Sequence, residues 1–60
     1  MDKARFLKVY ANLPINFRNE IVLVLEDYGP ITWNVAFIEI NNNTKLGKII
    51  LERLIRLKIV

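Results

Sequence analysis

Apolar residues are grouped along the chain in four segments, which three turn-forming clusters separate. The clusters are Asn12-Leu13-Pro14, Asp27-Tyr28-Gly29-Pro30 and Asn41-Asn42-Asn43. Proline fixes the backbone, glycine frees it, and asparagine side chains bond the nearby backbone, so each cluster favours a turn. The pattern therefore predicts four short elements within one domain, residues 1–60.

The first segment predicts a helix over residues 3–11. Phe6, Leu7 and Tyr10 form an apolar stripe at helical spacing, and Asp2 is suited to cap the start of the helix. Because the residue before a proline is pushed out of helical space, the helix should end by Leu13.

The second segment fits a helix and a strand almost equally well. A helix over residues 17–28 is favoured by the spacing of its apolar residues, which are Phe17, Ile21, Val24, Leu25 and Tyr28. The run from Ile21 to Leu25, however, is also typical of a strand buried on both faces. The length of the segment and the charged residues at both ends favour the helix.

The third segment is ambiguous in the same way. Thr32 is a good helix cap, and a helix over residues 32–40 places four apolar residues on one face, namely Trp33, Ala36, Phe37 and Ile40. Trp33 is expected in the core of that helix, with a base-stacking or partner-binding role as the alternative. A strand is suggested instead by apolar residues at every second position, namely Ile31, Trp33, Val35 and Phe37.

The fourth segment predicts the clearest helix, over residues 44–57, with Asn43 or Thr44 as its cap. Gly47 near its start marks either a close backbone crossing or a chance glycine. Its apolar positions cover more than the stripe of about 100° that one face can bury, and they are Leu46, Ile49, Ile50, Leu51, Leu54, Ile55 and Leu57. This excess predicts a homodimer with twofold symmetry, with Ile49, Leu57 and Ile59 as the expected contacts.

Together these segments predict a mainly α fold, a small helix-turn-helix-like helical domain. The alternative is an α+β fold in which a β-hairpin at 21–40, pairing 21–26 with 31–40, packs on the N-terminal and C-terminal helices.

Charge adds a candidate function. The chain carries nine basic and six acidic residues, a net charge of +3, and five of the basic residues lie in the last sixteen positions. A basic helix of this kind is suited to nucleic-acid phosphates, with Lys45, Lys48, Arg53 and Arg56 as the candidate contacts. The alternative is a protein-interaction or self-assembly module, such as an adaptor or an antitoxin-like partner. A plain solvated helix face is the third interpretation.

The amino-acid composition excludes several classes of function. The chain has no Cys, His or Ser and no phosphate-cradling glycine loop, so we expect no catalytic residues, metal, cofactor or small-molecule substrate. The longest apolar run, residues 21–25, is far shorter than the roughly 18 residues of a membrane span. We therefore expect a non-enzymatic cytoplasmic protein that does not bind membranes.

Residues 18–60 resemble a winged helix-turn-helix domain. The first matching block runs from Arg18 to Thr32 and contains Tyr28-Gly29-Pro30-Ile31-Thr32, and the second runs from Leu51 to Val60. The resemblance implies a first helix in the first block and a recognition helix that ends in the second. It departs from the family where Leu46, Ile49 and Ile50 fall on the base-reading positions, where Lys58 replaces a glycine, and where no wing follows.

The chain is also similar to a family of small uncharacterised prokaryotic proteins. The shared stretches are Tyr-Ala-Asn-Leu-Pro at 10–14, Thr-Trp-Asn-x-Ala-x-x-Glu-Ile at 32–40 and Thr-x-Leu-Gly-x-x-Ile-Leu at 44–51. This resemblance spans nearly the whole chain and implies no particular activity.

Overall fold

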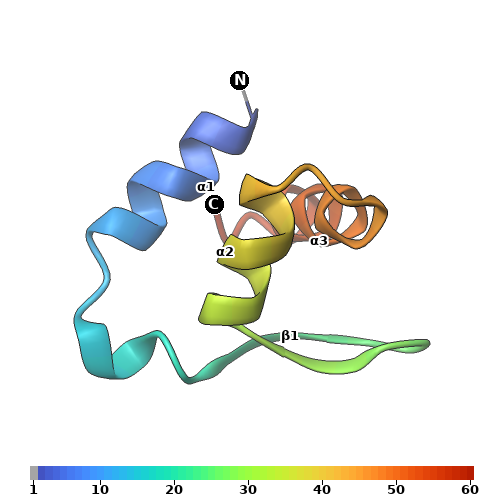
Figure 1. Cartoon of the computed structure of the whole chain (residues 1–60), viewed down its shortest axis with the longest axis horizontal. Helices are drawn as coiled ribbons and strands as arrows, with labels where there is room; N and C mark the ends of the chain where they lie inside the picture. Colours follow the sequence, from blue (N-terminus) through green and yellow to red (C-terminus); the bar gives the residue numbers. More distant parts are fainter. Residues whose placement is uncertain (1) are drawn as a thin grey trace.

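The computed structural model describes residues 2–60 and combines helices with one β-hairpin (Figure 1). In chain order the elements are α1 (Asp2–Ala11), the 3-10 helix η1 (Ile15–Phe17), β1 (Ile21–Leu25), β2 (Gly29–Thr32), α2 (Trp33–Asn41) and α3 (Lys45–Arg56). The fold class is therefore α+β, which agrees with the alternative prediction and not with the mainly α fold, because residues 21–32 form a β-hairpin. The helices expected at 3–11, 32–40 and 44–57 are confirmed within one residue at each end.

The hairpin forms one layer and the helices lie on one side of it. Figure 1 shows α2 above the hairpin, α3 seen nearly end-on beside α2, and α1 on the opposite side of α2. The chain end returns to α1, where the Arg5 guanidinium donates a hydrogen bond to the carbonyl of Val60 at 2.9 Å.

The helix predicted over residues 17–28 is wrong, because this stretch forms β1 and the hairpin turn. Leu23 and Leu25 are buried while Val24 between them is 65% exposed, so burial alternates with the period of a strand. The turn at 26–28 closes with a hydrogen bond of 3.2 Å from the Tyr28 N–H to the Leu25 carbonyl. Gly29 follows with a φ of +81°, the left-handed conformation that three-residue hairpin loops require.

The second strand is shorter than the alternative prediction of 31–40. β2 ends at Thr32 because its side chain caps α2, accepting a hydrogen bond from the Val35 N–H at 3.1 Å. The register pairs Leu23 with Ile31, and both side chains face the helices. The helical interpretation was thus correct from residue 33 onward, and the strand interpretation was correct before it.

The block that resembles the first helix of a winged helix-turn-helix domain is therefore not helical. The helices that follow the hairpin, α2 and α3, are joined by a three-residue turn.

Helix α2 and helix α3 approach each other closely at Gly47. A side chain at this position would collide with the backbone carbonyl of Glu39. Thr44, which lies between the two helices, caps α3 by accepting from the Gly47 N–H at 2.9 Å and donates to the side chain of Glu39. The glycine therefore marks a close backbone crossing, and Thr44 rather than Asn43 is the cap.

Two residues after the end of α2, and again after the end of α3, a residue other than glycine adopts the left-handed conformation. Asn43 has a φ of 57° and Lys58 a φ of 60°. At each end two amides bond back to the last turn, as in the Schellman motif; at α3, Lys58 donates to Ile55 and Ile59 to Leu54. The triple-asparagine stretch is thus explained as a turn, and Lys58 occupies a position that favours glycine.

The core lies between the hairpin and the helices. Its buried members come from the three α-helices and both strands, and they are Phe6, Leu23, Leu25, Ile31, Ala36, Ile40, Ile50 and Leu54. Trp33 is half-buried and packs against this cluster, with its ring centroid 6.1 Å from that of Phe6. The predicted core role of Trp33 therefore holds in part: the indole packs against the core without being fully buried.

A polar network holds α1, η1 and α2 together. The Tyr10 hydroxyl donates to the Asn34 side chain at 2.7 Å, and Asn34 donates to Asn19 at 2.8 Å. The guanidinium of Arg18 lies 4.4 Å from the Tyr10 ring centroid, a cation–π contact, and donates to the Tyr10 carbonyl. This network fixes the long connection between α1 and the hairpin.

Candidate nucleic-acid interface

Helix α3 divides into an inner apolar face and an outer basic face. Ile50 and Leu54 are fully buried, and Leu46 and Leu51 pack against the core. The opposite face carries residues three and four positions apart, which stand above one another on a helix. These outer residues are Lys45, Lys48, Ile49, Glu52, Arg53 and Arg56, and all of them are exposed.

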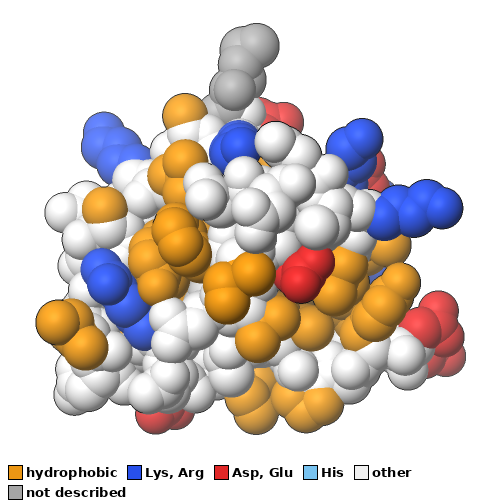
Figure 2. Space-filling view, viewed as in Figure 1, with side chains coloured by type: hydrophobic (Ala, Val, Ile, Leu, Met, Phe, Trp, Pro, Cys, Tyr) orange, Lys and Arg blue, Asp and Glu red, His pale blue; other side chains and the backbone are white. Residues whose placement is uncertain are grey.

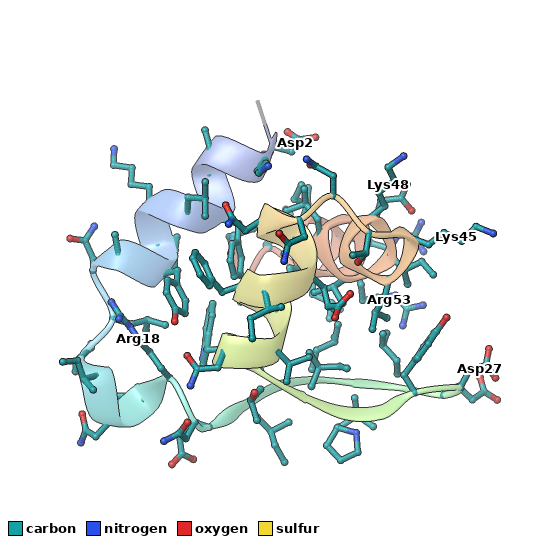
Figure 3. The ribbon with its side chains drawn as sticks, in the orientation of Figure 1. Asp2, Arg18, Asp27, Lys45, Lys48 and Arg53 are labelled. Atoms are coloured by element: carbon teal, nitrogen blue, oxygen red, sulfur yellow. The ribbon has the colours of Figure 1, made fainter. Side chains whose placement is uncertain are left out.

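The structure brings the four predicted phosphate contacts onto this one face. Lys45, Lys48, Arg53 and Arg56 all come from α3, and Figure 3 shows Lys45 and Lys48 pointing away from the body of the molecule. Within residues 2–60, the ion pairs at 4.0 Å or less are limited to Asp2 with Arg5. The four cations therefore have no carboxylate partner at that distance, and their charge is available to a ligand.

The burial of α3 changes the meaning of its apolar residues. Leu46, Ile49 and Ile50 fall on the positions that were compared above with the base-reading positions of a recognition helix. In this fold Leu46 and Ile50 face the core, and Ile49 alone is exposed, to 38%. The outer face is thus more polar than the sequence alone indicates.

Arg53 lies in a different environment from the two lysines. It lines a shallow cleft of about 160 Å³ between α3 and the hairpin turn, together with Leu25, Glu26, Asp27, Tyr28 and Ile49. Figure 3 shows Asp27 at the far end of the hairpin. Because two carboxylates line this cleft, the electrostatic attraction for an anion is weaker here than at Lys45 and Lys48.

One basic residue was missed by the sequence analysis. Lys3 of α1 reaches the turn between α2 and α3, where its ammonium donates to the Asn43 side chain at 3.1 Å. Lys3 and Lys48 line the same small hollow. Only the tertiary fold joins them, because Lys3 and Asn43 are forty residues apart in the sequence.

The three residues predicted at a dimer interface are all exposed but lie at different places. Ile49 is 38% exposed on the outer face of α3, Leu57 is 54% exposed at its C-cap, and Ile59 is 38% exposed beyond it. Four of the seven apolar residues of α3 already pack in the core of the same chain. The apolar excess that motivated the dimer prediction is therefore smaller than expected.

The sequence stretches at 32–40 and 44–51 have structural roles in this chain. Thr32 caps α2, Trp33 packs on the core, and Asn34 joins the polar network, while Thr44 and Gly47 form the crossing of α2 and α3. The contacts of these residues therefore lie within the fold of the chain.

Comparison of the chain with protein-family models, curated proteins and solved structures found no match. No helix in residues 2–60 combines the length and the apolar character needed to cross a bilayer.

Proposed function

We propose that this protein is a non-enzymatic module that binds nucleic acid in the cytoplasm through the outer face of α3. The observation that carries the proposal is the row of four exposed cations, Lys45, Lys48, Arg53 and Arg56, which lack a carboxylate within 4.0 Å among residues 2–60. Lysine and arginine in such a row neutralise backbone phosphates and release the counterions bound to them.

Helix α3 has few groups that would read a base sequence. Its outer face carries four cations, one acid and Ile49, and no asparagine or glutamine that would pair with adenine. It also carries no aromatic side chain on which single-stranded bases would stack. We therefore expect binding to duplex backbone with weak sequence preference.

Salt dependence tests the proposal directly. Four phosphate contacts on duplex DNA predict a slope of about −3.6 in the logarithm of affinity against the logarithm of salt concentration. Gel shifts at about 50 mM salt should detect the complex, and binding should weaken steeply by about 200 mM. The absence of a shift at high micromolar protein would contradict the proposal.

A matched control distinguishes binding by the outer face of α3 from an effect of the net charge of the molecule. Lys45→Gln, Lys48→Gln, Arg53→Gln and Arg56→Gln each remove one charge from α3, and Lys8→Gln removes one from the exposed side of α1. We expect each α3 variant to lower the slope by about 0.9, and Lys8→Gln to leave it unchanged. Equal losses in all five variants would indicate nonspecific attraction to the whole molecule.

The second candidate function is self-assembly or binding of a protein partner. It is favoured by the outer face of the hairpin, where Ile21 is 58% and Val24 is 65% exposed. Figure 2 shows hydrophobic side chains over the middle and lower part of the molecule, where α2 and the hairpin lie. The predicted homodimer through Ile49, Leu57 and Ile59 belongs to the same class.

Sedimentation at micromolar concentration distinguishes the two possible contact surfaces. If the C-terminal helix forms the interface, Ile49→Lys should produce monomers and Val24→Lys should not. The reverse result would assign self-association to the hairpin. A monomer for the unmodified chain at every concentration would contradict the dimer prediction.

A further inference from the structure

A small hollow lies where α1, the turn after α2 and the first turn of α3 meet. Its volume is about 40 Å³, and it is lined by Lys3, Ile40, Asn43, Gly47, Lys48 and Leu51. Two lysines from different helices therefore border one concave point, and the lining contains no acid. The hollow has room for about one water molecule, so a phosphate group would lie over its mouth rather than inside it.

The fold holds Lys3 in place at this point. Its ammonium donates to the Asn41 carbonyl and to the Asn43 side chain, each at 3.1 Å. An ammonium group has three N–H donors, so one remains for a ligand. Because the fold already orders this side chain, less conformational entropy is lost when an anion binds than at a free surface lysine.

The electrostatic setting also favours an anion at this end of α3. The N-terminus of a helix carries the positive end of its dipole, and Lys48 lies in this first part of α3. Two acids of the neighbouring helices already have partners: Asp2 lies 4.0 Å from Arg5, and the Glu39 carboxylate accepts a hydrogen bond from Thr44. At the other end of the basic row, by contrast, Arg53 shares its cleft with Glu26 and Asp27.

From these observations we infer that Lys3 and Lys48 together form a phosphate-binding position, which extends the nucleic-acid footprint from α3 onto α1. One phosphate oxygen accepts from the remaining N–H of Lys3, and another oxygen accepts from Lys48. The inference rests on the proposed function, because it names a further contact of the same ligand. It assigns Lys3 a role that its neighbour Lys8, exposed on the same helix, does not have.

The test compares Lys3→Gln with Lys8→Gln in salt titrations against a short DNA duplex. Lys3→Gln should reduce the salt slope by about 0.9, and Lys8→Gln should leave it unchanged. Lys3→Arg keeps the charge and the donors, so it should retain the full slope. Equal slopes for the Lys3→Gln and Lys8→Gln variants, with binding still dependent on Lys45, would overturn this inference and leave the proposed function standing.

A second measurement does not depend on the folding of a variant. Backbone amide shifts of the unmodified protein should change at Asn43 and Gly47 when the duplex is added, and stay constant at Lys8. Inorganic phosphate at millimolar concentration should produce a smaller shift at the same amides, because it lacks the other contacts of the duplex. Shifts confined to residues 45–56 would overturn the inference, and a lack of any shift with duplex would overturn the proposed function as well.

Discussion

The hairpin and the α2–α3 pair are both rich in apolar residues, but they differ in how tightly they are packed. In the helix pair the two backbones approach so closely at Gly47 that no side chain fits there. In the hairpin, Leu23, Leu25 and Ile31 face the core, while Ile21 and Val24 remain more than half exposed at 58% and 65%. A two-stranded sheet covered on one face leaves the residues of its other face in solvent.

The comparison indicates where the stability of this small domain is concentrated. A chain of sixty residues has little stability in reserve. We expect substitutions at the α2–α3 crossing to be severe and substitutions on the outer face of the hairpin to be nearly neutral. Four predictions test this difference, from the largest expected effect to the smallest.

Gly47→Ala should have the largest effect. The added methyl group would meet the carbonyl of Glu39, which is backbone and cannot rotate away. We expect a loss of about 3 kcal/mol or more in the free energy of unfolding, measured by chemical denaturation.

The matched control is Gly29→Ala in the hairpin. Its φ of +81° disfavours alanine, but nothing lies within 4 Å of the new methyl group. The expected cost is about 1 kcal/mol. Equal losses at the two glycines would show that conformation, and not the helix crossing, dominates at Gly47.

Trp33→Ala tests the junction between the two regions, because this residue begins α2 directly after β2. The indole is half-buried beside Phe6, so the expected loss is about 3 kcal/mol, at the low end for removing a large aromatic side chain. Thermal unfolding followed by circular dichroism measures it. Normal stability combined with lost ligand binding would show that Trp33 is a surface contact.

Removing the threonine cap at the α2–α3 crossing should cost more stability than removing the cap beside the hairpin. Thr44→Ala removes a cap bond to Gly47 and a bond to the side chain of Glu39, whereas Thr32→Ala removes one cap bond to Val35. We expect losses of about 2 and about 1 kcal/mol respectively. A larger loss for Thr32→Ala in denaturant titrations would contradict this and show that the start of α2, beside the hairpin, contributes more stability than the start of α3.

Val24→Lys should have the smallest effect. The side chain is 65% exposed on the outer face of β1, so the free energy of unfolding should change by no more than about 0.5 kcal/mol. A strong destabilisation that depends on protein concentration would show that another chain covers this face.

The sequence predicted the helices of this fold better than its hairpin. The stretches that became α1, α2 and α3 have turn residues at their ends. The cap of α2, Thr32, was predicted correctly, and the cap of α3, Thr44, was one of two candidates. The segment at 17–28 misled because Ile21 and Leu25 are spaced equally well for both structures. Gly29 and the loop before it favour the hairpin locally, but this three-residue loop geometry was not recognised in the sequence.

For the candidate site, the four basic residues of α3 could be predicted from the sequence, whereas the lysine of α1 could not. Lys45, Lys48, Arg53 and Arg56 could be found because helical spacing alone places them on one face. Lys3 could not, because its proximity to Lys48 depends on how α1 packs against the turn between α2 and α3. The direction of Leu46 and Ile50 was likewise hidden, since a single helix does not reveal which of its faces is covered.

The sequence by itself determined the local features of this protein: where turns fall, that Thr32 caps α2, and that the C-terminal helix is basic on one side. The predicted cap Asp2 instead lies within the first turn of α1. The local features depend on backbone sterics and on neighbours within about four residues, so they can be read along the chain. Only the tertiary structure decided that Ile21–Leu25 is a strand, that Gly47 lies against Glu39, and that Lys3 stands beside Lys48. Each of these depends on which surfaces pack together to remove apolar area from water, and that choice is made by the whole chain at once.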